Sequence, residues 1–370
     1  MTKVLKFFGW LLLTLVVLFG GLILYATISN YTPEEITTLE TNGTPDVLIS
    51  DMQIDLMIWN IGYCGLDAGM DFFYDGGKQV RPPESNVKEN LNEVLRFLEA
   101  NDSIDFFLLQ EVDIDSRRSY GINQYDSIRN LKQGYHFFPG MNYNVFFVPL
   151  PFTNPMGRVE SGLQTLSRYS PSGVNRHSFP GNYAWPKNLF MLDRCFLVSR
   201  HPLENGREML LINTHNSAYD DGSLRKMQME YLKGFLLDEY SRGNYIIVGG
   251  DWNQSPPGFP KQFADQVFDD KDYSEIAADY LPDNWQWVWD GSYPTNRRVA
   301  TVYQKGESPT TLIDFFLVSP NVEIFEVKTI DLNFKHSDHQ PVLLKAGLRS
   351  GFSDQTGSRL ISYSGMCLFY

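Results

Sequence analysis

The most constraining feature of this 370-residue chain is a recurring pattern, in which a short apolar run of strand length ends in, or carries, a polar side chain. One example is IDLMIWNIGY at 54–63, an almost continuous apolar run that contains Asn60. Such runs are typical of strands that are covered on both faces. The pattern occurs six times, and it presents the polar side chains of Asn60, Glu111, Asn213, His215, Asp251, Asn253, Asp314, Asp338 and His339.

Two amphipathic helices are predicted between these strands, over residues 85–100 and 223–240. In both segments, apolar side chains recur at helical spacing. The apolar fraction of 43% and the aromatic fraction of 14% are those of a well-packed globular protein. A chain of this length can bury one large core or two modest ones.

The N-terminal segment differs in kind from the rest, because residues 7–28 carry no charge and follow Lys3 and Lys6. At about 1.5 Å per residue this stretch spans roughly 33 Å as a helix, enough for the hydrocarbon core of a bilayer. We predict an uncleaved transmembrane helix within residues 1–30. The alternative is a cleavable signal peptide, whose apolar region is usually shorter, about 7–15 residues.

The charges on either side of this segment predict how the chain is oriented. Lysines precede the apolar stretch, and Glu34 and Glu35 follow it. This bias predicts a single-pass membrane protein with a cytoplasmic N-terminus and an extracytoplasmic catalytic domain. Residues 31–50 are polar and are predicted to form a loop-like stalk, residues 51–347 the catalytic domain, and residues 348–370 a C-terminal tail of unassigned purpose.

The charge balance argues against one class of partner. Lys3 and Lys6 are two of the 31 basic residues, so 29 basic and 44 acidic residues lie outside the apolar segment and give the body a net charge of −15. Duplex DNA binders gain most of their affinity when a basic surface releases counterions from phosphates. Nucleic acid is therefore a disfavoured partner, although a local basic patch or bound cations would allow it.

The cysteine content excludes a disulfide framework. Cys64, Cys195 and Cys367 are few, odd in number and widely spaced. They also lack the spacing of a zinc site. We expect them to act as small buried hydrophobic residues.

Most of the polar side chains at strand ends have an ordinary explanation when taken alone, because an acid often caps a turn and a lone histidine is usually structural. Asp314 is different, because it lies in the middle of the apolar strand TTLIDFFLVS at 310–319. A buried carboxylate without a partner is strongly destabilising, so Asp314 needs one. The segment KHSDHQPVLLKA at 335–346 offers a histidine beside another acid, and His339 is therefore the predicted partner.

Taken in order, these motifs resemble the endonuclease/exonuclease/phosphatase superfamily, which includes deoxyribonuclease I, abasic-site endonucleases, inositol polyphosphate 5-phosphatases and neutral sphingomyelinases. The segment GLQTLSRYSP at 162–171 also resembles the strand that precedes the family's first histidine. The motifs cover residues 52–347. They are WNIG with Asn60, QEVD with Glu111, NTHNSAYD with His215, GGDWNQSP with Asp251 and Asn253, IDFFLVS with Asp314, and SDHQPV with Asp338 and His339.

The resemblance implies an α/β (α+β) fold. The expected architecture is a four-layer α/β sandwich, with two packed mixed β-sheets flanked by helices and the site where loops meet at one edge of the sheets. The predicted N-terminal transmembrane helix is additional to this fold.

The resemblance also implies a metal ion. The family's reaction is attack of water on a phosphorus ester, and a divalent cation neutralises the phosphoryl oxygens as a Lewis acid. We expect Mg²⁺, with Mn²⁺ as a substitute, because Mg²⁺ prefers oxygen ligands and needs only one or two carboxylates. The implied ligands are Glu111 first, assisted by Asn60 and Asp338.

Catalytic roles follow from the same resemblance. His339 is expected to act as the general base, held in one tautomer by Asp314. Asp251 is expected to orient or deprotonate the same water. Asn253 and His215 are expected to hydrogen-bond the phosphoryl oxygens as charge builds on them.

Substrate choice is expected to lie in three loops, at 64–86, 168–188 and 285–298, because loops between strands carry specificity. Arg297 and Arg298 are candidates for clasping a phosphate, and the alternative for this pair is a solvated turn. Aromatic side chains in these loops either meet lipid or pack on the body, and packing is the expectation.

The predicted function is a membrane-anchored, Mg-dependent phosphoric ester hydrolase. Its substrate would be a lipid headgroup or another small phosphoester, cleaved by phosphodiesterase or phosphatase activity. The alternative within the family is an extracytoplasmic endonuclease or exonuclease, which the net charge disfavours. A third alternative is a non-enzymatic scaffold, in which at least one catalytic position should be substituted, and none is.

Overall fold

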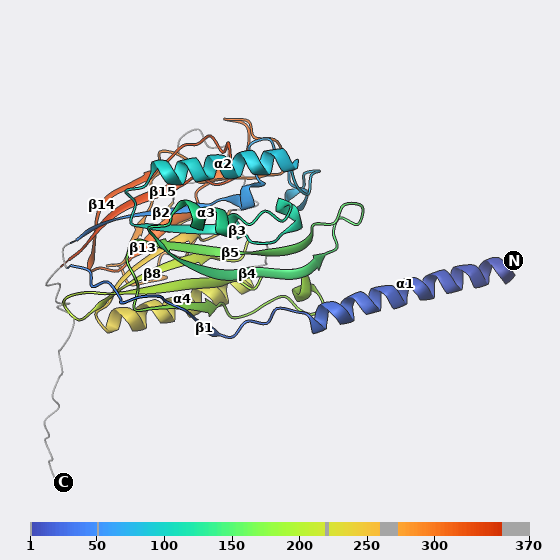
Figure 1. Ribbon diagram of the computed structural model, residues 1–370, viewed down its shortest axis with the longest axis horizontal. Helices are drawn as coiled ribbons and strands as arrows, with labels where there is room; N and C mark the ends of the chain where they lie inside the picture. Colours follow the sequence, from blue (N-terminus) through green and yellow to red (C-terminus); the bar gives the residue numbers. More distant parts are fainter. Residues whose placement is uncertain (1, 50–51, 219–221, 260–272, 350–370) are drawn as a thin grey trace, which may run out of the picture.

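The computed structural model describes residues 2–49, 52–218, 222–259 and 273–349. Within these residues the strands form two large sheets that pack face to face, with helices on their outer faces (Figure 1). Both sheets are mixed, because β2–β3 and β8–β9 pair in parallel and the remaining pairs within these two sheets are antiparallel. The predicted sandwich of two packed mixed sheets is confirmed.

Six of the described strands make up the first sheet. In spatial order they are β14 (Val322–Thr329), β15 (Val342–Leu348), β2 (Gln53–Asn60), β3 (Phe106–Asp113), β5 (Gly157–Ser167) and β4 (His136–Val148).

Seven of the described strands make up the second sheet, and a separate short pair, β11 (Asn296–Arg297) and β12 (Thr310–Thr311), lies outside both. The order of the second sheet is β1 (Ile36–Leu39), β6 (Gly173–Ser178), β7 (Cys195–Pro202), β8 (Glu208–His215), β9 (Tyr245–Asp251), β13 (Asp314–Val318) and β10 (Gln286–Val288).

The helices cover the outer faces of the sheets, except for the first. α2 (Glu84–Ala100) and α3 (Gln124–Leu131) pack on the first sheet, α4 (Ser223–Ser241) packs on the second, and α1 (Thr2–Ile28) projects away from the body (Figure 1). α2 and α4 begin and end within one residue of the predicted helices. Short 3₁₀ turns complete the described elements: η1 (Gly62–Cys64), η2 (Phe73–Asp75), η3 (Arg117–Ser119) and η4 (Lys187–Phe190).

The alternation of side chains along β2 explains its continuous apolar sequence. Leu56 and Ile58 face the second sheet and pack in the cluster that holds Leu211. Met57 and Trp59 face the opposite way, toward α2. Both faces of this strand are therefore covered, and neither can be polar.

The segment 31–50 was predicted to be a loop-like stalk, but its described residues, 31–49, lie along the body. It contains β1, which pairs with β6 at the edge of the second sheet. Further on, the Ser170 amide donates to the Asp46 carboxylate and the Leu48 amide to the Pro202 carbonyl. The sequence did not predict β1, because this strand is short and lies in a largely polar segment. An edge strand of this kind can pair while burying little of its surface.

The two ends of the chain are the helix α1 and the predicted C-terminal tail. Among the described residues, α1 alone is long and apolar enough to cross a membrane, a property that signal sequences share. The predicted C-terminal tail lies outside the described residues, apart from Leu348 and Arg349. Cys64 and Cys195 are buried and free, whereas Cys367 also lies outside the described residues.

Candidate active site

Strand direction brings the predicted site residues to one edge of the sandwich. β2 and β3 are parallel, so Asn60 and the end of β3 share an edge of the first sheet. β8 and β9 are also parallel, and their register places His215 directly beside Asp251. β13 runs the opposite way and starts with Asp314 opposite Asp251. The carboxyl ends of the parallel strands thus deliver polar groups to a common place, as in other open α/β sheets.

The paired glycines before Asp251 allow the two sheets to approach each other at this edge. A Cβ atom on Gly249 would lie 2.6 Å from Ile58 Cγ2, on the first sheet. A Cβ atom on Gly250 would lie 2.0 Å from the carbonyl oxygen of Thr214, and Gly250 has a φ of +147°. No side chain fits at either position, so the glycine pair is a packing requirement of the site.

Glu111 reaches the site through an irregularity in β3. The pairing of β3 with β5 shifts register between Leu109 and Val112, which is where a β-bulge re-aims a side chain. Glu111 itself has a φ of +53°, in the left-handed region that non-glycine residues seldom adopt. Asn253 has a φ of +51°. Such strained backbone persists where surrounding structure holds it, commonly at functional sites.

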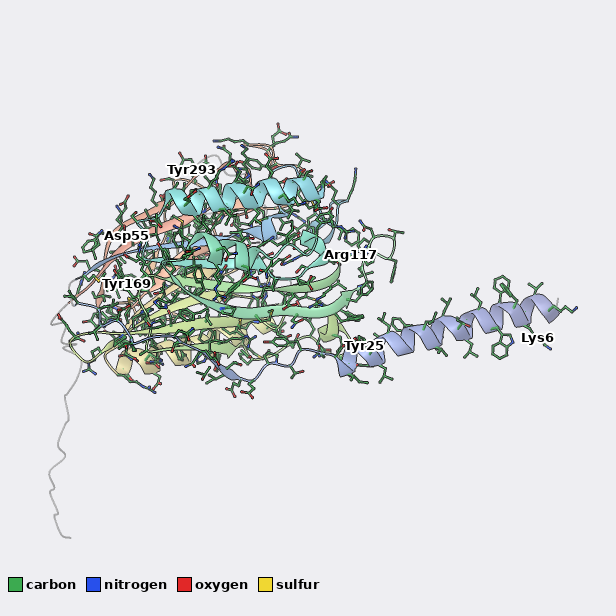
Figure 2. The ribbon with its side chains drawn as sticks, in the orientation of Figure 1. Lys6, Tyr25, Asp55, Arg117, Tyr169 and Tyr293 are labelled. Atoms are coloured by element: carbon green, nitrogen blue, oxygen red, sulfur yellow. The ribbon has the colours of Figure 1, made fainter. Side chains whose placement is uncertain are left out.

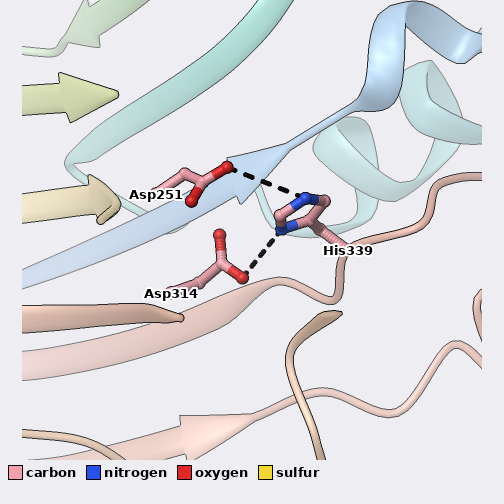
Figure 3. Close-up of side chains that lie close together, drawn as sticks. All are labelled: Asp251, Asp314 and His339. Carbon is pink, nitrogen blue, oxygen red and sulfur yellow. Dashed lines mark hydrogen bonds and ion pairs between the residues drawn. The ribbon is translucent and has the colours of Figure 1, made fainter. Parts of the chain in front are cut away.

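Asp314 and His339 form a buried hydrogen-bonded pair. The distance between His339 Nδ1 and Asp314 Oδ2 is 2.8 Å, and both side chains are almost fully buried (Figure 3). The Trp59 indole donates to the His339 carbonyl at 3.1 Å and fixes the backbone. Asp314 therefore has His339 as its partner, as the sequence predicted.

The charges around His339 determine its protonation. Burial alone would lower the pKa of His339, but the nearby carboxylates of Asp314, Asp338 and Asp251 together raise this pKa well above its ordinary value. With Nδ1 engaged by Asp314, Nε2 faces the cleft, 3.7 Å from Asp251 Oδ2. Asn296 Nδ2 lies 3.0 Å from the same nitrogen.

Asp251 lies at the centre of the hydrogen-bond network. Its Oδ2 accepts from Asn60 Nδ2 at 3.0 Å and lies 3.4 Å from His215 Nε2. Its Oδ1 accepts from the Asn253 amide at 2.9 Å. Asn60 Nδ2 is also 3.3 Å from Glu111 Oε1. The two sides of the site are therefore joined through one amide group.

His215 is held as a neutral imidazole. Burial lowers its pKa well below the ordinary value, and the cations of Arg194 and Arg118 together with His339 act in the same direction. Its Nδ1 is buried and has no hydrogen-bond partner among the described residues. A neutral ring in this place can donate a hydrogen bond without adding charge.

The acids at the first sheet suit a divalent cation. Burial, with a contribution from the nearby Glu111 carboxylate, raises the pKa of Asp338 to about 7, although His339 and Arg297 oppose the shift. A bound cation would relieve the repulsion between the carboxylates of Glu111 and Asp338. Carboxylate oxygens are also the ligands that Mg²⁺ prefers. Ligand atoms of Asp251, Asp314 and His339 also lie within 4.8 Å of one another. We assign that group to catalysis, because the Asp314 contact with His339 Nδ1 is already a hydrogen bond.

Asn60 presents its NH₂ group to the acids. Its Oδ1 accepts from the Gly62 amide at 3.0 Å, which fixes the orientation of the side chain. Gly62 has a φ of +50°, and a Cβ atom there would lie 2.7 Å from Asp338 Oδ1. In this arrangement Asn60 acts as a hydrogen-bond donor between Glu111 and Asp251. A metal-ligand role for its oxygen stays a prediction.

These residues line a cleft of about 550 Å³. The cleft contains every predicted site residue except Asn60 and Asp314, which lie beneath it. Sequence reasoning missed several residues of its wall, including Arg118, Arg194, Arg225 and Asn296. Asn296 had a usable signal, since it directly precedes the arginine pair that was singled out.

Arg297, the first of the arginine pair, differs from both expectations, whereas Arg298 is partly exposed in the cleft wall. Arg297 is 1% exposed, and its guanidinium donates to carbonyl oxygens of Asp67, Met70 and Thr301. It is therefore neither a solvated turn nor a free phosphate clasp but a support for the loop at 64–86. Arg118 has a similar structural place, because it pairs with Asp113 and lies 3.8 Å from the centre of the Tyr63 ring.

Comparison with known proteins agrees with this architecture. The model of the Endonuclease/Exonuclease/phosphatase family matches residues 57–339. No curated protein matches the sequence at a significant level.

Solved structures show the same fold. The endonuclease/exonuclease/phosphatase from Beutenbergia cavernae has 17% identity and a TM-score of 0.53, over 80% of this chain and 72% of that chain. TDP2 from D. rerio, complexed with a single-strand DNA product, has 15% identity and a TM-score of 0.51, over 80% and 100%. ANGEL2, a 2',3'-cyclic phosphatase, has 18% identity and a TM-score of 0.50, over 80% and 95%. At these identities the likeness concerns the fold alone.

Proposed function

Because the chain belongs to the endonuclease/exonuclease/phosphatase family, whose members hydrolyse phosphoester bonds, we propose that it is a divalent-metal-dependent phosphoester hydrolase held at a membrane by α1. The observation that carries the proposal is a continuous set of contacts. Asp314 binds His339, His339 faces Asp251, and Asn60 links Asp251 to Glu111.

The histidine and its carboxylate partner are suited to activate water. In its neutral form, His339 Nε2 accepts a proton from the attacking water, and Asp314 stabilises the imidazolium that forms. Asp251, 3.7 Å from this nitrogen, orients the water. Water then adds to phosphorus, one P–O ester bond breaks, and the departing oxygen takes up a proton.

Neutral donors are suited to stabilise the phosphoryl oxygens. His215 and Asn253 both line the cleft on the side of the second sheet. Asn253 Nδ2 donates one hydrogen to the Asn216 carbonyl at 2.9 Å, which fixes the side chain and leaves its second hydrogen for substrate. Fixed donors of this kind favour the charge that develops in the transition state.

The cation belongs on the other side of the cleft. Glu111 and Asp338 would hold Mg²⁺ or Mn²⁺, with Asn60 beside them. When bound, the ion supplies Lewis-acid neutralisation of the phosphoryl oxygens.

A nuclease is the second candidate. It is favoured by the fold shared with a protein that was solved with single-strand DNA, and by arginines in the cleft wall. It is opposed by the net charge of −13.

A substrate panel separates the candidates. The full-length protein in detergent micelles is offered a chromogenic phosphodiester, a phosphomonoester, sphingomyelin and plasmid DNA, each with Mg²⁺ and with EDTA. His339→Ala, prepared identically, controls for contaminating activity. We expect metal-dependent turnover of a small or lipid phosphoester. Degradation of the plasmid alone favours the nuclease, and no metal-dependent turnover of any substrate contradicts the proposal.

A further inference from the structure

Exposed apolar side chains gather on one side of the body, beside α1. Phe146, Leu150 and Phe152 come from the end of β4 and the turn that follows it, and Trp185 comes from the loop after β6. Their exposed fractions are 51%, 43%, 85% and 62%. Residues 137–157, which contain the first three, carry no charged side chain. We call these four side chains the apolar rim.

Two side chains of the apolar rim, Phe146 and Trp185, contact the C-terminal end of α1. The rings of Phe146 and Tyr25 lie 4.6 Å apart, edge to face. The Trp185 indole nitrogen donates to Thr27 Oγ1 at 3.3 Å. Figure 1 shows α1 leaving the body at the same end of the sandwich as the turn between β4 and β5, and Figure 2 marks Tyr25 where the helix meets the body, with Lys6 near the far end.

The position of these contacts along α1 sets the depth of the rim in a bilayer. The uncharged stretch begins at Phe7, and about 20 helical residues cross the hydrocarbon core, which places the far interface near Ala26. Tyr25 therefore lies at the interface, where aromatic side chains are favoured. Phe146 touches Tyr25 and lies at the same level.

Strand directions place the rim at the edge of the sandwich that holds the catalytic cleft. β3 and β4 are both antiparallel to β5, so β4 runs parallel to β2 and its following turn shares the edge of Asn60. β6 runs parallel to β8 because both are antiparallel to β7, so the Trp185 loop shares the edge of His215. The chain also arrives from α1 at this edge, since Ile36 pairs with His177 at the end of β6.

The cleft wall and the rim are parts of the same segments. Tyr74 lines the cleft, and its hydroxyl donates to the Leu150 carbonyl at 2.7 Å. Tyr143, three residues before Phe146 in β4, also lines the cleft. The mouth of the cleft is thus bordered by the residues that carry the rim.

Two cations flank the rim. Arg81 donates to Asn154 Oδ1 at 3.0 Å, in the turn between β4 and β5. Lys187 lies over the Tyr183 ring at 3.8 Å, two residues after Trp185. Cations beside apolar side chains fit a surface of lipid phosphates over hydrocarbon.

We propose that the apolar rim rests in the bilayer that holds α1, so that the cleft opens onto this bilayer and its substrate is the phosphate-bearing headgroup of a lipid in the same leaflet. This inference rests on the proposed function for the chemistry of the cleft. Water adds to the headgroup phosphorus, a P–O ester bond of the lipid breaks, and the released oxygen is protonated. A partner protein is the other possible occupant of the rim, and the test below separates the two.

The first experiment measures the position of the rim without using activity. Phe152→Cys is labelled with an environment-sensitive fluorophore in a Cys367→Ser chain, and the full-length protein is reconstituted in phosphatidylcholine vesicles. The matched control is Phe325→Cys, on β14, where the native side chain is 54% exposed. We expect a blue-shifted Phe152 label that is quenched by spin-labelled lipid, and a Phe325 label that stays in water. Equal exposure of the two labels to water would overturn the inference.

The second experiment measures substrate choice. Phe152→Ser in the reconstituted protein should lower headgroup release from vesicles of phosphatidylcholine and sphingomyelin by about tenfold or more, through lost burial of an aromatic ring. Turnover of a soluble chromogenic phosphodiester should not change, and Phe325→Ser should change neither. Equal loss on both substrates, or turnover of the soluble substrate without any lipid hydrolysis, would overturn the lipid assignment. Absence of turnover on both would instead overturn the proposed function, while the label still decides where the rim lies.

Discussion

The carboxylates of Asp251 and Asp314 come from residues directly opposite each other in the antiparallel pair β9–β13, and each lies near a different nitrogen of the His339 ring (Figure 3). Asp314 contacts Nδ1 at 2.8 Å, and Asp251 lies 3.7 Å from Nε2. The two acids are therefore equivalent in the sheet but not in chemistry. One orients the ring, and the other faces the side of the ring that opens to the cleft.

Removal of His339 or of Asp251 should abolish turnover in a protein that still folds, with a lower stability for the His339 variant because Asp314 loses its partner. His339→Ala deletes the proposed base, and Asp251→Ala deletes the group that is proposed to orient the water. Steady-state hydrolysis of a chromogenic phosphodiester measures the loss, and circular dichroism with thermal unfolding checks the fold. Activity near that of the wild type in either folded variant would refute the assignment.

Asp314→Asn should lower kcat without raising KM. The amide keeps the shape of the side chain but no longer stabilises an imidazolium, and in a comparable carboxylate–histidine pair this change costs about 10⁴-fold in kcat. The matched control is Asp290→Asn, at a partly buried acid whose hydrogen bonds to Thr329 and Ser292 are structural. An unchanged kcat for Asp314→Asn would contradict the positioning role.

Glu111→Gln should weaken metal binding more than it weakens substrate binding. The variant removes one negative charge from the acids that are proposed to hold the ion, and the half-saturating Mn²⁺ concentration should rise by about tenfold to a hundredfold. Isothermal titration with Mn²⁺ measures this directly. Glu160→Gln, at an acid that pairs with Arg158, is the control and should bind the ion as the wild type does.

Gly250→Ala should destabilise the fold by about 3 kcal/mol or more, because the new Cβ atom would lie 2.0 Å from the Thr214 carbonyl oxygen. Gly234→Ala, in the interior of α4 with no atom within 4 Å of the new Cβ, should instead stabilise it by about 0.5–1 kcal/mol. Urea unfolding of the two variants gives the comparison. Equal effects would show that the glycine pair is not a packing requirement.

Acid should destabilise the protein through a histidine far from the site. Burial lowers the pKa of His201 to about 3, with a further contribution from His136, whereas the ordinary value is 6.5. The unfolded chain therefore binds more protons between these values, and stability falls as the pH drops below 6.5. By pH 5 this histidine should account for about 2 kcal/mol of the lost free energy of unfolding. His201→Gln should reduce the difference between the free energies of unfolding at pH 6.5 and at pH 5. An unchanged difference would contradict the contribution assigned to His201.

The sequence predicted the parts of the fold in which local pattern and burial agree. The apolar strands that become β2, β3, β8, β9 and β13 are covered on both faces, and α2 and α4 have one apolar face. β4 was not predicted, because Pro139 and Gly140 interrupt its sequence. Proline is tolerated there because β4 is an edge strand, a fact that only the sheet order provides.

The candidate site divides in a similar way. Residues at strand ends, such as Asp251 and His215, were predictable because strand direction gathers them. Arg118 was not, since its place depends on a stack against the Tyr63 ring, and the position of Asn296 before the arginine pair was its one sequence signal. The family resemblance, by contrast, is confirmed, because the order of the motifs is a property of the sequence itself.

The connection between α1 and β1 has a consequence for kinetics. Residues 29–35 separate the two elements, and fully extended they reach at most about 25 Å. With α1 as the proposed membrane anchor, the enzyme would reach only the substrate lipids that diffuse laterally to it within the membrane that holds it. Its rate of hydrolysis should depend on the mole fraction of substrate within that membrane. The rate should not change when further vesicles are added to the solution.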